Sequence, residues 1–63
     1  MDKNFEYLIS EYQDRMQMLS DAMARGMCTS FEEYKFACGQ FRGLESACSV
    51  IKDLVDRLEK LDE

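Results

Sequence analysis

The chain has 63 residues, enough for one domain at most, and a domain this short buries only a marginal core unless disulfides, metal or oligomerisation support it. It has no proline, three glycines, 46% hydrophobic residues and 33% charged residues, a composition typical of a folded all-α domain and not of a disordered tail. The net charge of −5 disfavours non-specific binding to nucleic acid and to anionic membranes, but it permits a basic protein partner.

An apolar repeat with spacings of four and three residues predicts a first helix from about Asn4 to Arg25. Its members are Phe5, Ile9, Tyr12, Met16, Leu19 and Met23, and Leu8 and Ala22 widen it. Asp2 or Asn4 can cap the start of this helix. Gly26 directly follows a basic residue, which is a helix-termination signal.

The connection to the second helix is short. Residues 27–28 form the turn, and two overlapping capping boxes follow, Thr29 with Glu32 or Ser30 with Glu33. Either box starts the second helix at about residue 30. Because so short a connection makes two helices antiparallel neighbours, the sequence predicts a helical hairpin.

The second helix is predicted to run from Ser30 to Leu61, about 45 Å at 1.5 Å per residue. An uninterrupted heptad repeat of apolar residues supports it. The repeat consists of Tyr34, Ala37, Phe41, Leu44, Cys48, Ile51, Val55 and Leu58. In the hairpin this repeat packs on the first helix, which brings Met16 close to Phe41.

A second apolar stripe runs beside the first on the same helix. It consists of Gly39, Gly43, Ala47, Val50, Leu54 and Leu61, and Arg57 interrupts it. Each glycine costs about 0.8–1 kcal/mol of helix stability relative to alanine, so a close contact should offset that cost. Two explanations are open. The glycines make room for Met16, Met18 or Tyr12 within the hairpin, or another helix packs closely on them in an oligomer.

The first helix is too short to cover the end of the second. Leu54, Val55, Leu58 and Leu61 are therefore expected to be uncovered, at a cost comparable with the whole stability of so small a domain. We predict that residues 1–63 form a single antiparallel hairpin that dimerises into a four-helix bundle. The predicted partner or oligomer interface consists of Gly39, Gly43, Ala47, Val50, Leu54, Val55, Leu58 and Leu61.

No residue set forms a candidate catalytic, cofactor-binding or metal site, and we expect no enzymatic activity. The chain has no histidine to activate a nucleophile or to bind zinc, and no CxxC pair. Cys28, Cys38 and Cys48 are spaced by ten residues, about 15 Å along one helix, which is too far for a disulfide. We expect Cys38 and Cys48 to be small buried residues.

No stretch approaches 18 apolar residues, so no membrane span is expected. The N-terminal sequence MDKNFEYLIS lacks a basic start followed by an apolar run, so no secretion signal is expected either. These features favour a cytosolic setting.

Residues 33–58 follow the pattern EYxxxxGxxxGLxxAxxxIxDLxxRL. This pattern resembles that of short uncharacterised helical-hairpin proteins of tailed bacteriophages, which tend to lie among head and tail morphogenesis genes. The resemblance covers about half the chain. It implies a phage structural or assembly accessory protein, virion-associated or in the host cytoplasm, that binds itself or another phage structural protein.

The sequence can also be compared with two other functions. In size and plan the chain is similar to the Rop-type RNA-binding plasmid regulators, but its basic residues do not share one stripe, so nucleic acid is not the expected partner. The alternative is an acidic phage effector that mimics nucleic acid and inhibits a host nucleic-acid-binding protein. Its carboxylates would be Glu45, Asp53, Asp56 and Glu59.

Overall fold

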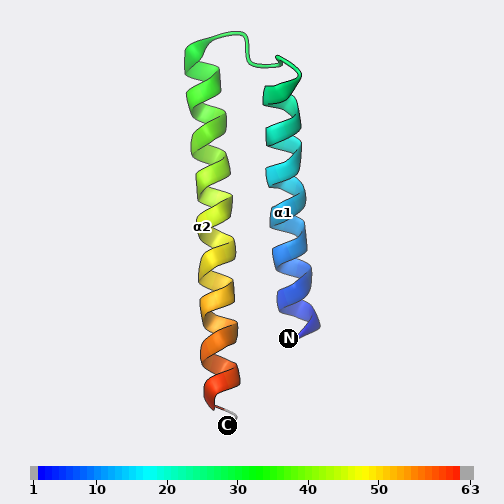
Figure 1. Cartoon of the computed structure of the whole chain (residues 1–63), viewed down its shortest axis with the longest axis vertical. Helices are drawn as coiled ribbons and strands as arrows, with labels where there is room; N and C mark the ends of the chain where they lie inside the picture. The colour runs from blue at the N-terminus through cyan, green and yellow to red at the C-terminus, as the bar shows by residue number, and fades with distance from the viewer. Residues whose placement is uncertain (1, 62–63) are drawn as a thin grey trace.

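The structure is a computed structural model that describes residues 2–61. These residues form two helices, α1 (Lys3–Ala24) and α2 (Phe31–Leu61), and no strand. The two helices lie side by side in opposite directions and are joined at one end by a short turn (Figure 1). The predicted all-α hairpin is confirmed, and the predicted helix ends differ from those observed by one residue at most.

Both ends of α1 are capped by local hydrogen bonds. The carboxylate of Asp2 accepts a hydrogen bond of 2.7 Å from the Asn4 N–H, so Asp2 is the N-cap. Gly26 has a φ of +75°, and the N–H of Met27 donates to the Ala22 carbonyl at 3.0 Å. This left-handed residue with its backward hydrogen bond is a Schellman motif, which ends the helix where the sequence predicted.

The start of α2 is fixed by Ser30 and Glu33, the pair of the second predicted capping box, although the Glu33 side chain returns to Thr29 instead of to the Ser30 N–H. Ser30 Oγ accepts a hydrogen bond of 3.1 Å from the Glu33 N–H. The Glu33 carboxylate in turn accepts from the Thr29 N–H at 2.8 Å and from Thr29 Oγ1 at 2.9 Å. These hydrogen bonds favour the charged form of Glu33 and hold its pKa below the usual value.

Acid is expected to weaken the start of α2. Because the folded-state pKa of Glu33 lies below the unfolded value of about 4.3, the stability from this carboxylate is fully present above that pH. It is lost as the pH falls through the folded-state pKa. Thermal unfolding followed by circular dichroism should therefore show wild type more stable than Glu33→Gln at pH 7. The difference should vanish below that pKa, and a pH-independent difference would contradict this role.

The core is a narrow seam between the helices. Its buried members are Ile9 on α1 and Ala37, Cys48 and Val55 on α2. Met16 and Phe41 line one groove between the helices, as the predicted register requires for this pair. Of the cysteines expected to be buried, Cys48 is buried and Cys38 is half-buried.

One expectation about the end of α2 is wrong. Val55 was expected to be uncovered, yet it is 4% exposed, the lowest fraction reported for the described side chains. Helical side chains lean toward the N-terminus of their own helix. In an antiparallel pair, the first turn of α1 therefore leans toward Val55, and Val55 leans back toward α1. Leu54 and Leu58 are 42% and 41% exposed, and Leu61 is 81% exposed.

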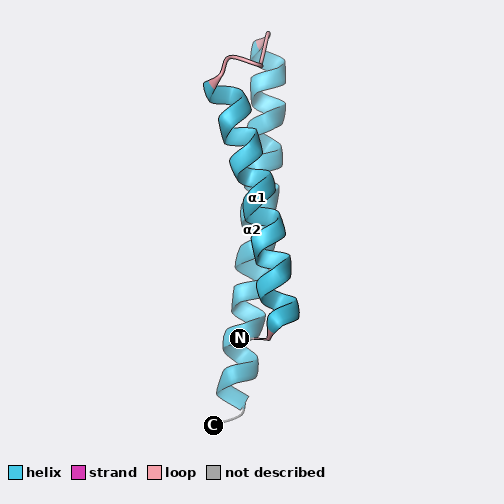
Figure 2. Ribbon diagram, turned by 90° about the vertical axis from the view of Figure 1, so that its right-hand side faces the viewer, coloured by secondary structure: helices cyan, strands magenta, loops and turns pink. Residues whose placement is uncertain are grey.

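The hairpin is a thin rod. Its extents are 51, 17 and 12 Å, and α2 continues past the N-terminal end of α1 (Figures 1 and 2). Its radius of gyration is 14.9 Å, whereas a compact chain of this length would have about 10.6 Å. Most side chains of such a rod lie on its surface, so the character of each side decides what the molecule can bind.

Candidate protein-docking face

An apolar stripe on α2 lies beside the core and is not covered by α1. We call it the docking stripe, and it consists of Phe36, Gly43, Ala47, Val50, Leu54 and Leu61. The spacings of seven, four, three, four and seven residues put these positions on one side of the helix. Phe36 is 70% exposed and Val50 64% exposed. The stripe is interrupted only at the heptad positions of Gln40 and Arg57.

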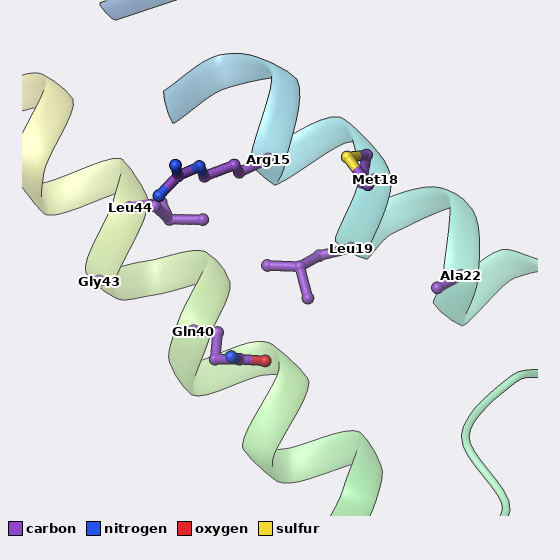
Figure 3. Close-up of a pocket in the computed structure, with 7 residues that line it drawn as sticks. All are labelled: Arg15, Met18, Leu19, Ala22, Gln40, Gly43 and Leu44. Atoms are coloured by element: carbon purple, nitrogen blue, oxygen red, sulfur yellow. The ribbon is translucent and has the colours of Figure 1, made fainter. Parts of the chain in front are cut away.

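An open groove of about 620 Å³ lies between α1 and α2 next to the docking stripe. Gln40, Gly43 and Leu44 line it from α2, and Arg15, Met18, Leu19 and Ala22 line it from α1. Leu19 points into the space between the helices, and the Arg15 side chain reaches toward Leu44 (Figure 3). The groove is therefore lined mostly by apolar residues, with Arg15 and Gln40 as its polar side chains.

The opposite side of the hairpin is more polar. The grooves there are lined by both polar and apolar residues. The polar residues are Gln13, Gln17 and Ser20 of α1 and Arg42, Glu45, Ser49, Lys52 and Asp53 of α2, and the others are Met16, Met23, Cys38, Phe41 and Cys48. Exposed apolar side chains also lie elsewhere, among them Tyr7, Met27 and Phe31, but the docking stripe joins several of them in one row along α2. A partner that buries apolar area would approach from the side of the docking stripe.

The two glycines of α2 face open space within the hairpin. A Cβ placed on Gly39 or on Gly43 would meet no atom within 4 Å. The explanation that these glycines make room for Met16, Met18 or Tyr12 is therefore wrong. A close contact with another helix in an oligomer stays a prediction for these two positions.

The eight predicted interface residues do not all lie on one surface. Five of them, Gly43, Ala47, Val50, Leu54 and Leu61, belong to the docking stripe. Gly39 and Leu58 are exposed and flank the stripe on opposite sides, and Val55 belongs to the core. Phe36 was missed, although it lies seven residues before Gly43, and continuing the repeat backwards would have found it.

Few features of the described residues suggest other chemistry. No group of three or more histidine, cysteine, aspartate or glutamate side chains within residues 2–61 could hold a metal ion. Neither described helix is long and apolar enough to cross a membrane. At the hairpin tip, Lys35 Nζ lies 5.4 Å from the centre of the Phe31 ring, a cation–π contact on the surface.

Comparison with protein families, with curated proteins and with solved structures found no match for this chain. The geometry of the hairpin itself is therefore what indicates a function. The main feature of the hairpin is a long apolar stripe on one side of a rod.

Proposed function

We propose that the chain is a non-enzymatic protein–protein interaction module that buries the docking stripe and the adjoining groove against another protein surface. The amount of exposed surface carries this proposal. The hairpin exposes 5222 Å², whereas a compact monomer of 7.4 kDa would expose about 4,200 Å². The excess of roughly 1,000 Å² is comparable with the roughly 800 Å² that each partner buries in a standard interface.

The arrangement of side chains on this surface suits docking. Large apolar side chains, among them Phe36, Leu54 and Leu61, can act as anchors, and Gly43 leaves a depression between them. The polar side chains of Arg15 and Gln40 also line the groove, where they can orient a partner. The surface is long and narrow, which favours a helix as the bound element.

The resemblance of residues 33–58 to short proteins of tailed bacteriophages supports a more specific role. Under this proposal the chain is a structural or assembly accessory protein, present in the virion or in the host cytoplasm. Its partner is a second copy, another phage structural protein, or both in turn.

A pull-down with two matched variants tests this role. Phage particles and host lysate would be probed with wild type, with Leu54→Ala/Leu61→Ala and with Asp53→Asn/Asp56→Asn/Glu59→Gln. The apolar variant is expected to lose particle binding because it removes anchors, and the charge variant is expected to keep it. Circular dichroism should confirm that both variants remain helical.

The opposite outcome would favour the acidic effector. In that case only the charge variant would lose its partner, the partner would be a host nucleic-acid-binding protein, and binding would weaken steeply with salt. Retention of particles by the apolar variant would show that the docking stripe is not the binding surface.

A further inference from the structure

We propose that the docking stripe is covered by the docking stripe of a second copy, with the two α2 helices antiparallel. This inference rests on the proposed function, because it names the partner of the same surface. The excess exposed surface is large enough for one interface of standard size. The order of the residues along the stripe identifies the partner.

The stripe is complementary to itself when its direction is reversed. Turning α2 around a point midway between Ala47 and Val50 sets each of these two residues opposite the other in the second copy. The same operation sets Gly43 opposite Leu54 and Phe36 opposite Leu61. In the two pairs nearest the axis, Ala47 with Val50 and Gly43 with Leu54, a small residue faces a larger one. The stripe is therefore self-complementary, as a twofold interface requires.

The two polar interruptions of the stripe also meet in this register. Gln40 comes opposite Arg57 of the second copy, where its side-chain oxygen can accept a hydrogen bond from the guanidinium group. A shift by one heptad in either direction would set Gln40 or Arg57 against an apolar residue. A parallel pair would set Arg57 against Arg57. Of these arrangements, only the unshifted antiparallel register sets both polar residues of the stripe, Gln40 and Arg57, opposite each other without placing like charges together.

This arrangement also gives the end of α2 a partner. The end of α2 continues past α1, so α1 of the same chain flanks it poorly (Figure 1). In the antiparallel pair, this end lies along the turn end of the second copy, where the groove beside Gly43 opens. Leu54 of one copy then packs on Gly43 of the other copy, and Leu58 of the first copy lies over the groove of the other. Each copy fills the groove of the other.

Cysteine cross-linking tests the register. In a background of Cys28→Ser, Cys38→Ser and Cys48→Ala, chains with Gly43→Cys and chains with Leu54→Cys would be oxidised separately and as a mixture. Only the mixture is expected to give disulfide-linked dimers. Position 43 lies level with position 54 of the second copy, but about 16 Å along the axis from the second copy's position 43, which is beyond disulfide range.

A second test does not depend on removing cysteines. Gln40→Lys is expected to weaken dimerisation by placing like charges together, and addition of Arg57→Glu is expected to restore it. Positions 40 and 57 are about 25 Å apart along α2, so this rescue must occur between chains. Sedimentation equilibrium of the full chain measures both effects.

Several results would overturn the proposal. Disulfide dimers of either single variant alone would show a parallel pair. A wild-type chain that remains a monomer at micromolar concentration would exclude the second copy, yet particle binding through the docking stripe could still be observed in the pull-down. The wild-type chain could also dimerise while the mixture of cysteine variants gives no cross-link and Arg57→Glu does not rescue Gln40→Lys. That result would place the dimer contact on another surface.

Discussion

Replacing Gly43 with leucine is expected to separate the proposed dimer and, at the same time, to stabilise the single hairpin. In one chain a Cβ at Gly43 meets nothing within 4 Å, so the substitution removes a glycine penalty of about 0.8–1 kcal/mol. In the proposed dimer the new side chain would collide with Leu54 of the second copy. Overpacking of this kind costs about 1–3 kcal/mol, and it would occur at two symmetric positions.

Sedimentation equilibrium and thermal unfolding at two protein concentrations distinguish these effects. The melting temperature of wild type should rise with concentration, whereas that of Gly43→Leu should not. Ser49→Ala is the matched control, because Ser49 lies on the more polar side and the change also improves helix propensity. If Gly43→Leu dimerises as tightly as wild type, no helix packs closely on Gly43.

The sequence predicted the fold and the ends of its helices well because those signals are local. Ser30 and Glu33 are three residues apart, and the hydrogen bond that closes α1 joins Met27 to Ala22. Within so short a span, residue types alone fix which donors and acceptors can meet. The heptad repeats then fix which sides of the two helices face each other.

The errors concern features that spacing does not encode. Counting residues from the turn treats each side chain as level with its Cα atom, so the lean that buries Val55 was overlooked. The surroundings of Gly43 depend on where the α1 side chains point, and Met18 is 70% exposed and leaves Gly43 open. Sequence alone could not decide between the two explanations of the glycines.

For the same reason, the sequence predicted only part of the docking stripe. Its middle, from Gly43 to Leu54, follows from periodicity, whereas Phe36 lies before the first glycine and was not joined to the repeat. In the folded hairpin both Phe36 and Val50 are largely exposed, and their positions on α2 lie on the same side of the helix. What covers a surface stripe is a property of an assembly, so a single chain can indicate it only through self-complementarity.

A carboxylate at position 55 is expected to unfold the hairpin, and the same change at position 61 is expected to leave it folded. Val55 is almost completely buried, so Val55→Asp would either bury an unpaired charge or break the seam. A penalty of several kcal/mol is comparable with the roughly 3–5 kcal/mol that a core of this size supplies. Leu61 is 81% exposed in the single chain, so Leu61→Asp removes only a surface anchor.

Circular dichroism at low concentration, followed by sedimentation, separates the two variants. Val55→Asp should lose most of its helical signal at every concentration. Leu61→Asp should keep the helical signal of the dilute hairpin but associate more weakly, because its charge would lie against Phe36 of the second copy in the proposed register. Val55→Asn repeats the first change without the charge and should also unfold, since burial of an unpaired amide is costly. A folded Val55→Asp chain with the wild-type melting temperature would show that α1 does not cover Val55, and the docking surface would then extend to the core side of α2.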